Sequence, residues 1–292
     1  MKKTSLKLIV CALLVTMVGG AFVGCGSTAS TDTTEEKSIA ISGSTALLPL
    51  MEAAVEGFKA QNAGYEINAQ GGGSGTGLTQ VLDGSVNIGN SDMFANENLS
   101  ADKATQLVDH QVCAEGFAVA VNKNLGITNL TKDQIKKIFS GQVKNWKEVG
   151  GPDKAILVIH RTASSGTRAT FVKTVLDGDK ALENDAIGAT QDANGSVLTA
   201  MQQSEGAISY LGLAYLSGDA KDKLVGVSID GVSPDKANIT TGKYVFWSWG
   251  HMYTKGEATG LSKKFIDYIT SADDTNNIEK LGFVSASDMK VK

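Results

Sequence analysis

The sequence contains little of what enzymes, metal sites and disulfide-stabilised folds are built from. Its 292 residues include three cysteines, three prolines and three histidines. No Cys-x-x-Cys pair occurs, and His110, His160 and His251 are too far apart to form a spaced ligand motif. The Gly-x-Ser-x-Gly motif of hydrolases is also absent around Ser74 and Ser165. We therefore expect no catalytic residues, no metal and no cofactor.

A run of apolar side chains long enough to cross a bilayer comfortably is also missing. The apolar stretch at residues 8–18 is shorter than the roughly 20 residues of a membrane-spanning helix. Three lysines precede it, and the segment AFVG leads from it to Cys25, a pattern that resembles the bacterial lipobox. Residues 1–24 are therefore predicted to be a lipoprotein signal peptide. Cys25 is predicted to carry acyl chains, such as palmitate, that anchor the protein at the extracytoplasmic face of the cell membrane. An ordinary secretory signal with an incidental cysteine is the alternative.

A small, polar segment follows the predicted signal peptide. Residues 26–36 include no large apolar side chain and cannot bury enough surface to fold, so residues 25–37 are predicted to form a disordered tether. Without residues 1–24 the chain loses three of its 27 basic residues and keeps all 31 acidic residues, which gives a net charge of −7. That balance argues against a nucleic-acid partner. Since Cys11 leaves with the signal peptide and Cys25 carries the lipid, we expect no intrachain disulfide.

The rest of the chain, residues 37–292, alternates between short apolar strand patterns and helical patterns. Strands are predicted at residues 38–41, 65–69, 86–89, 117–121, 156–160, 207–210 and 244–247. Helices are predicted at residues 47–60, 78–83, 132–139, 168–176, 197–203 and 263–269. This alternation predicts an α/β fold, in which helices form layers around mixed or mostly parallel sheets.

The length of this part is enough for two lobes of ordinary size. Residues 117–121 have the pattern of a strand that crosses from one lobe to the other, and the aromatic-rich segment 244–253 is placed to cross back. We therefore expect lobe I at residues 38–117 and 252–292, and lobe II at residues 118–251.

Three turns of small polar residues connect a strand pattern to a helical pattern. They are residues 42–46 (SGSTA), 71–77 (GGGSGTG) and 161–167 (RTASSGT). The start of a helix offers unpaired backbone N–H groups and the positive end of the helix dipole, which together bind small anions. The glycine-rich turn lacks the Gly-Lys-[Ser/Thr] sequence of a P-loop. Taken singly, the first two turns are also explained by helix capping and a flexible loop. Three such turns in one chain instead predict a single site that surrounds an oxyanion.

Two charged residues would give this site its selectivity. Asp92 ends the segment 86–92 (VNIGNSD), and Arg161 begins the third turn. Hydrogen phosphate carries an O–H that needs an acceptor, whereas sulfate carries none at neutral pH. One buried carboxylate therefore accepts phosphate and repels sulfate. The planar guanidinium of Arg161 supplies the compensating positive charge and fits phosphate oxygens. The alternative for Asp92 is a solvated turn residue.

Together these segments resemble the phosphate-binding protein of bacterial phosphate ABC transporters, the PstS type. The resemblance rests on residues 42–46, 73–77 (GSGTG), 88–92 (IGNSD), 161–167, 138–141 (IFSG), 145–146 (NW), 150–151 (GG) and 206–210 (GAISY). It covers residues 38–292, and the motifs occur in the family's order. It implies a two-lobe periplasmic-binding-protein-like fold of class II, with the ligand in the cleft between the lobes.

The resemblance also implies which residues hold the phosphate. Asp92 would accept the phosphate proton, and Arg161 would pair with the phosphate charge. The other residues implied to contact the ligand are Ser44, Thr45, Ala46, Ser74, Ser165, Gly166 and Thr167. We expect a monomer without enzymatic activity that captures inorganic phosphate and delivers it to the membrane permease subunits of the transporter.

Three alternatives stay open at this point. In the first, the protein binds another oxyanion, such as sulfate, molybdate or tungstate. In the second it is a phosphatase, although the sequence is poor in the nucleophiles, bases and metal ligands that hydrolysis needs. In the third it is a surface adhesin or structural lipoprotein, and the three turns only cap helices.

Overall fold

The computed structural model describes residues 36–271 and 277–291, which belong to one compact unit, Glu35–Lys292. The predicted signal peptide at residues 1–24, the predicted acylation site Cys25 and the predicted tether up to residue 35 lie outside the described residues. Within the described ranges, no helix has both the length and the apolar character needed to cross a membrane.

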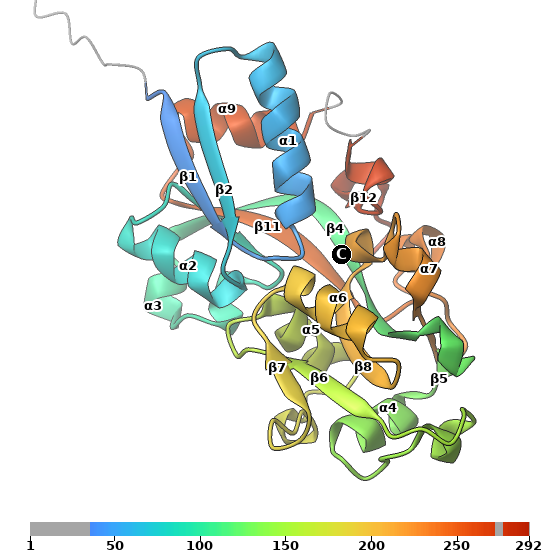
Figure 1. Ribbon diagram of the computed structural model, residues 1–292. Coiled ribbons are helices and arrows are strands. Elements are labelled where there is room, and N and C mark those ends of the chain that lie inside the picture. Colours follow the sequence, from blue (N-terminus) through green and yellow to red (C-terminus); the bar gives the residue numbers. More distant parts are fainter. Residues whose placement is uncertain (1–35, 272–276, 292) are drawn as a thin grey trace, which may run out of the picture. The chain divides into compact units, whose positions relative to one another are not determined.

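The strands of the described residues are arranged mainly in one mixed sheet (Figure 1). They are β1 (Ser38–Gly43), β2 (Glu66–Gly71), β3 (Ile88–Ser91), β4 (Leu107–Asn122), β5 (Asn129–Leu130), β6 (Leu157–Arg161), β7 (Ala189–Gln191), β8 (Ala207–Gly212), β9 (Leu224–Gly226), β10 (Ser228–Ile229), β11 (Trp247–Lys255) and β12 (Val284–Ser285). The main order is β2-β1-β3-β11-β4-β8-β6-β7, and β9 and β12 also pair with β4. Strand β1 is parallel to β2 and β3, and β6 is parallel to β7 and β8, whereas β4 is antiparallel to β8 and β11.

Helices cover both faces of this sheet. They are α1 (Leu48–Gln61), α2 (Ser74–Asp83), α3 (Ala101–Ala104), α4 (Lys132–Phe139), α5 (Gly166–Thr174), α6 (Asn194–Gln203), α7 (Ala220–Lys223), α8 (Lys236–Thr240) and α9 (Gly260–Ile269). Two 3₁₀ helices used below are η4 (Lys180–Leu182) and η5 (Leu213–Leu216). Local sequence fixes some of these boundaries: Thr131 and Gln134 exchange side-chain-to-backbone hydrogen bonds at the start of α4. The predicted α/β fold with a mixed sheet is confirmed.

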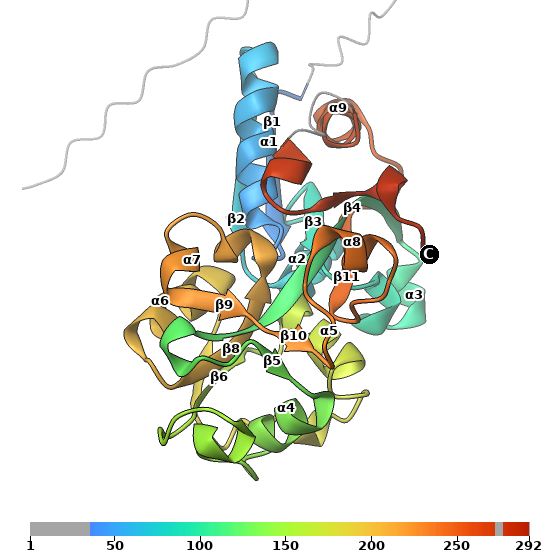
Figure 2. The ribbon, with the colours of Figure 1, turned by 90° about the vertical axis from the view of Figure 1, so that its right-hand side faces the viewer.

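At one end of the sheet, alternate side chains of β1 face two different layers of helices. Ile39 and Ile41 are buried in a cluster that includes apolar residues of α1 and α9, whereas Ala40 packs against a cluster that includes residues of α2. Figure 2 shows α1 and α9 as neighbours, and they are in contact. Because successive side chains of a strand point to opposite faces, β1 must be covered on both sides.

The other end of the sheet is covered in the same way. Phe117, Val119 and Val121 of β4 share a core cluster with residues of α4 and α5, while Ala120 lies in a separate cluster with residues of α6. The two ends therefore have their own apolar cores, and each core is divided by the sheet.

Strand β4 connects these two ends. It spans 16 residues and pairs with β11 along its first half, and with β8 and β9 along its second half. The strand pattern at residues 117–121 therefore identified only the second half of a much longer strand. The expected lobe boundaries fall inside β4 and β11 and stay a prediction.

One predicted strand is wrong. Residues 244–246 lie outside any strand, and β11 begins at Trp247. Tyr244 and Phe246 are fully buried, so their apolar character serves core packing from a loop. The long antiparallel pairing with β4 selects the following, more polar segment instead, because strand preference depends on the neighbouring strand more than on the local pattern.

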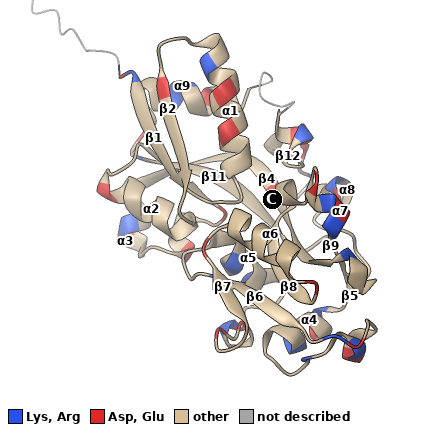
Figure 3. Ribbon diagram, in the orientation of Figure 1, with Lys and Arg blue, Asp and Glu red and all other residues tan. Residues whose placement is uncertain are grey.

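Charged side chains of both signs are mixed on the outer helices (Figure 3). Helix α4 carries three lysines and one aspartate, and the short helix α7 carries two lysines and one aspartate. Lys132 and Lys136 on α4 both pair with Asp177, and their hydrogen bonds lower the pKa of Asp177 to about 2. Such exposed pairs contribute little to stability, so the apolar cores hold the fold together.

Helix α2 packs directly on the backbone of β1 and β3, and Gly77 makes this approach possible. A Cβ atom at Gly77 would lie 2.7 Å from the Cα of Gly43 and 2.8 Å from the carbonyl oxygen of Asn90. We therefore expect Gly77→Ala to lower the free energy of unfolding by about 1–3 kcal/mol in urea denaturation.

Gly195→Ala in α6 is the matched control for this substitution. A Cβ atom there meets no other described atom within 4 Å, and alanine is the better helix former. Gly195→Ala should therefore leave stability unchanged or raise it slightly. Equal stability of Gly77→Ala and the wild type would show that α2 can move away from the sheet at no cost.

Candidate functional site

Four helices begin in one buried region of the fold. They are α1, α2, α5 and α6, and Figure 1 shows α1 and α2 above α5 and α6. Hydrogen bonds join their starts: the Gly75 N–H donates to the Ser164 carbonyl oxygen at 3.0 Å, and Asn194 Nδ2 donates to Thr45 Oγ1 at 2.9 Å. The positive ends of four helix dipoles are therefore close together, an arrangement that favours an anion.

The residues that the sequence singled out all lie in this region and are all buried. They are Ser44, Thr45, Ala46, Ser74, Asp92, Arg161, Ser165, Gly166 and Thr167. They come from the three predicted turns and from the residue that follows β3. The structure thus brings the three turns and Asp92 together, and the phosphate contact of each residue stays a prediction.

Arg161, the last residue of β6, is the cation at the centre of this region. Its side chain is only 1% exposed, and its Nη2 donates to Thr45 Oγ1 at 3.1 Å and to the Asp192 carbonyl oxygen at 3.0 Å. Its Nε and Nη1 have no hydrogen-bond partner among the described residues. Burial lowers the pKa of Arg161, and neighbours that include Asp92 act in the opposite direction. An arginine keeps its proton under such conditions, so two buried donors on a fixed positive charge are available to an anion.

Asp92 faces the same region from the end of β3. Its Oδ2 accepts a hydrogen bond from the Thr167 hydroxyl at 3.0 Å, and its backbone N–H donates to Ser74 Oγ at 3.0 Å. Its Oδ1 is buried and has no hydrogen-bond donor in the described part of the chain. A Cβ atom at Gly166 would overlap Ser74 Oγ and lie 2.8 Å from the Cβ of Asp92. The start of α5 therefore approaches Asp92 as closely as a glycine allows.

Three serines of the site use their side-chain oxygen as an acceptor within the chain. Ser44 Oγ accepts from the Ala46 N–H at 3.0 Å, Ser74 Oγ accepts from Asp92 as described above, and Ser165 Oγ caps α5. Because each serine oxygen accepts a backbone N–H through a lone pair, its own O–H hydrogen can donate to an anion. The Ala46 N–H, in contrast, already has a partner in Ser44, so its predicted donation to the ligand would compete with this bond.

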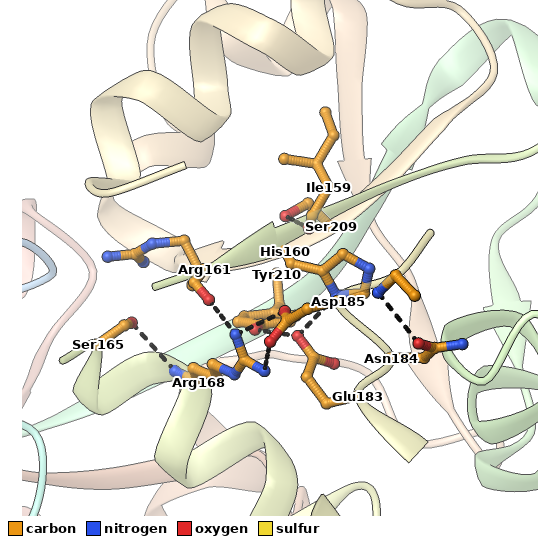
Figure 4. A network of polar contacts seen from close by, with 11 residues as sticks. Ile159, His160, Arg161, Ser165, Arg168, Glu183, Asn184, Asp185, Ser209 and Tyr210 are labelled. Atoms are coloured by element: carbon orange, nitrogen blue, oxygen red, sulfur yellow. Dashed lines mark hydrogen bonds and ion pairs between the residues drawn. The ribbon is translucent and has the colours of Figure 1, made fainter. Parts of the chain in front are cut away.

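A polar network holds the backbone of Arg161 (Figure 4). Arg168 on α5 donates to the Arg161 carbonyl oxygen and makes two further hydrogen bonds, at 2.8 and 2.7 Å, with the carboxylate of Asp185. These bonds lower the pKa of Asp185 from its ordinary value. Arg168 therefore joins α5 to the end of β6, the two elements that carry Arg161 and Thr167.

His160 belongs to a second part of this network, away from the Arg161 side chain. Its Nδ1 lies 3.0 Å from Glu183 Oε1, which also accepts from the Tyr210 hydroxyl at 2.6 Å (Figure 4). All three side chains are buried, and burial raises the pKa of Tyr210 well above its ordinary value, so Tyr210 is a neutral donor. The cluster ties β6, β8 and the residue after η4 together, which gives His160 a structural role.

Two cavities flank the buried site. One, of about 690 Å³, is lined by residues that include Thr45 and Asp192. The other, of about 780 Å³, is lined by residues that include Asp92 and Trp247. Thr45 and Asp92 line different cavities and Arg161 lines neither, so the buried groups of this region separate the two cavities. An anion held there is shielded from water, which strengthens each electrostatic contact.

Reasoning from the sequence missed three residues of this region. Asn194 is fully buried, and besides its bond to Thr45 it accepts from the Gly212 N–H at 2.9 Å. Tyr215 donates to the Thr45 carbonyl oxygen at 2.6 Å, and Glu115 on β4 is buried beside Asp92. Asn194 starts a helix just after a strand, as the three predicted turns do, and Glu115 is the single charged residue in the apolar run 112–121. These two features could have predicted Asn194 and Glu115 as residues of this region, whereas nothing in the sequence distinguishes Tyr215.

Comparison with known families identifies the class of protein. A family model described as the PBP superfamily domain matches residues 28–273. A crystal structure from Clostridium perfringens, described as a phosphate ABC transporter substrate-binding protein with bound phosphate, has a TM-score of 0.78 and 31% identity, and covers 85% of this chain and 99% of that chain. An ABC-type phosphate transport receptor from Vibrio cholerae has a TM-score of 0.66 and 25% identity, over 84% and 99% of the two chains. The chain is a member of the PBP superfamily, with the periplasmic-binding-protein-like fold expected from its motifs.

Curated relatives narrow this class to one family. The phosphate-binding protein PstS of Bacillus subtilis is 46% identical over an alignment of 299 residues, which covers 100% of this chain and 97% of that protein. The phosphate-binding protein PstS of Borreliella burgdorferi is 26% identical over 85% of this chain and 90% of that protein. The chain belongs to the PstS-type phosphate-binding proteins.

Proposed function

We propose that this protein captures inorganic phosphate at the extracytoplasmic face of the cell membrane and delivers it to the permease subunits of an ABC importer. One observation carries the proposal: Arg161 Nε and Nη1 and Asp92 Oδ1, all buried and unpartnered within the described residues, occur where four helices begin. Donors on a fixed cation, together with helix N-termini, bind a tetrahedral oxyanion. A carboxylate acceptor suits an anion that brings its own proton. The relatives named as phosphate-binding proteins support this ligand.

Asp92 argues against the alternative oxyanions. Sulfate, molybdate and tungstate carry no proton at neutral pH, so each would face the Asp92 carboxylate with like charge and without a hydrogen bond. A buried polar group left unpaired in this way typically costs about 1–3 kcal/mol, and an unpaired charge costs more. Phosphate is therefore favoured because it avoids the repulsion by Asp92 that the other anions meet, and because its O–H donates a hydrogen bond to Asp92.

Isothermal titration calorimetry with phosphate, sulfate and molybdate tests the proposal on the chain from residue 26 onward, which contains the whole compact unit. We expect phosphate to bind with a Kd of about 1 μM or lower, since several charge-assisted hydrogen bonds of about 1.5–3 kcal/mol each are available. Sulfate should bind at least about 100-fold more weakly. Equal affinity for the two anions would contradict a phosphate site.

We also propose that two lobes close on the ligand, lobe I at residues 38–117 and 252–292 and lobe II at residues 118–251. The bonds Arg161–Thr45 and Thr167–Asp92 support this, because each joins one lobe to the other. Small-angle X-ray scattering of the calorimetry samples should show a more compact protein with phosphate than without it. Identical scattering curves would argue against closure.

The protein is proposed to act as an acylated monomer that binds and releases its ligand unchanged. The lipobox pattern before Cys25 supports the anchor, and the family of substrate-binding proteins supports capture without catalysis. Acyl chains on Cys25 would hold the binding unit near the permease by way of the predicted tether. Membrane association that persists in Cys25→Ser would contradict this anchor.

A further inference from the structure

Glu115 is a buried acid whose position calls for a chemical explanation. It lies in the stretch of β4 that joins the two apolar ends of the sheet, and its side chain is 1% exposed. Glutamate is rarely buried to this extent unless a cation or a set of donors compensates its charge.

No such compensation exists for Glu115 in the part of the chain that the structure describes. Neither of its carboxyl oxygens has a hydrogen-bond donor there. On β11, the residue paired with Glu115 is Ser248, whose buried hydroxyl also lacks a partner among these residues. The titratable groups that act on Glu115 are Asp92, after β3, and Tyr215, on η5. Both are neutral or negative, so an ionised Glu115 would be an uncompensated buried charge.

Asp92 is the charged neighbour of Glu115, and after burial its charge and a side-chain hydrogen bond with it both raise the pKa of Glu115. If both were ionised, Asp92 Oδ1 and both Glu115 oxygens would face no donor among the described residues. A single proton shared by the pair removes the like-charge repulsion and supplies the missing donor. Asp92 accepts a hydrogen bond from the Thr167 hydroxyl, whereas neither carboxyl oxygen of Glu115 has a donor among the described residues. The proton therefore belongs on Glu115.

We propose that Glu115 carries a proton at neutral pH and donates a hydrogen bond to Asp92, which makes Glu115 a positioning and specificity-determining residue of the phosphate site. Its effect on binding rests on the proposed function, whereas its protonation does not. The Glu115 O–H holds the Asp92 carboxylate in one orientation and leaves it further lone pairs that can accept from the phosphate O–H. A neutral Glu115 also adds no second negative charge beside a bound anion.

This arrangement makes phosphate affinity depend on pH in a definite direction. Burial, followed by the charge of Asp92, raises the pKa of Glu115 well above its ordinary value. Below that raised pKa, Glu115 is neutral and donates a hydrogen bond to Asp92, and affinity is retained. Above it, Glu115 is negative beside Asp92 and the anion, and affinity is lost. Phosphate itself also titrates, so the informative quantity is the ratio of wild-type affinity to that of a variant without a titratable group at this position.

Three variants of the chain from residue 26 test the proposal. Glu115→Gln keeps a neutral side chain with a hydrogen-bond donor, and Glu115→Leu keeps neutrality without a donor. Glu66→Gln changes an exposed glutamate on β2 and is the matched control. Infrared difference spectra of the ligand-free proteins measure the C=O stretch of a protonated carboxyl, and calorimetry with inorganic phosphate measures affinity on both sides of the pH at which that band disappears.

At pH 7 we expect a protonated-carboxyl band in the wild type and in Glu66→Gln, and none in Glu115→Gln. As the pH is raised through the value at which the band disappears, the ratio of the wild-type affinity to that of Glu115→Gln should fall at least about tenfold. At pH 7, Glu115→Leu should bind phosphate at least about tenfold more weakly than Glu115→Gln.

Absence of the protonated-carboxyl band from the wild type at pH 7 would overturn the proposal. A ratio of wild-type to Glu115→Gln affinity that stays constant through the pH at which the band disappears would also overturn it. If Glu115→Leu does not fold, the spectra and the wild-type-to-Gln ratio still decide the matter. If the wild type does not bind phosphate at all, the proposed function fails, while the infrared band alone still settles the protonation of Glu115.

Discussion

Arg161→Met is expected to lower phosphate affinity by at least about 30-fold. The substitution keeps most of the side-chain length and removes the buried guanidinium that donates to Thr45 and to the Asp192 carbonyl oxygen. Removing one partner of a buried, hydrogen-bonded charge pair costs about 2–5 kcal/mol, which corresponds to a factor of about 30 to several thousand in Kd. Calorimetry with phosphate, compared with the wild type, measures the loss directly.

A second variant and a control show which property of Arg161 matters. Arg161→Lys keeps the charge but replaces the planar fork of five donors by three donors on one nitrogen, so it should bind more weakly than the wild type and more tightly than Arg161→Met. Lys123→Met changes an exposed cation and should have no effect. Phosphate binding by Arg161→Met within threefold of the wild type would contradict the role of Arg161.

Stability should respond differently from binding. In the ligand-free protein, Arg161 is a buried charge with two nitrogens that lack partners among the described residues. The cost of burying these groups opposes the two hydrogen bonds that Arg161 makes, so the unfolding temperature of ligand-free Arg161→Met should differ little from that of the wild type. Addition of phosphate should raise the unfolding temperature of the wild type more than that of Arg161→Met, because a ligand that binds only the native state stabilises that state.

Asp92→Asn is expected to change which anion the protein prefers. The substitution removes the like charge that repels sulfate and provides an amide that can donate to a sulfate oxygen. We expect phosphate to bind more weakly, sulfate to bind more tightly, and the ratio of the two affinities to fall by at least about 100-fold, since a site built for one hydrogen bond strongly rejects a ligand that lacks it. Competition calorimetry with the two anions measures this ratio.

The matched control for Asp92→Asn is Asp219→Asn, which alters an exposed aspartate before α7. It should leave both affinities unchanged. If Asp92→Asn retained the wild-type preference for phosphate, selectivity would have to come from the geometry of the donors alone. The Glu115 proposal adds a further expectation: the dependence of affinity on the protonation of Glu115 should be weaker in Asp92→Asn, because the charge that Glu115 interacts with is gone.

Much of the site was predictable because its components are local. A turn of small polar residues between a strand and a helix is visible in a few consecutive residues, and it exposes backbone N–H groups wherever it occurs. The segments around Ser44, Ser74 and Ser165 could therefore be identified one by one. Asp92 and Arg161 could be predicted as site residues because a carboxylate can accept the proton of the anion and a guanidinium can pair with its charge.

Other features depend on residues far apart in the chain. Asn194 contacts Thr45 across 149 positions, and Arg161 contacts Thr45 across 116. Strand β11 was misplaced because its pairing with β4, rather than its own pattern, determines where it runs. The Ala46 N–H looked available for a ligand until the Ser44 hydroxyl was seen to accept from it.

The sequence by itself determined the alternation of strands and helices, the three turns and the two charged residues, since each of these follows from side chains that are neighbours along the chain. Only the tertiary structure decided that four helix starts meet, that Arg161 is buried with two nitrogens unpaired among the described residues, and that Glu115 is buried beside Asp92. The physical reason is that burial and pairing depend on what the rest of the fold places around a group. The same glutamate would be an ordinary ionised acid on the surface, and it becomes a candidate proton donor only where water and cations are excluded.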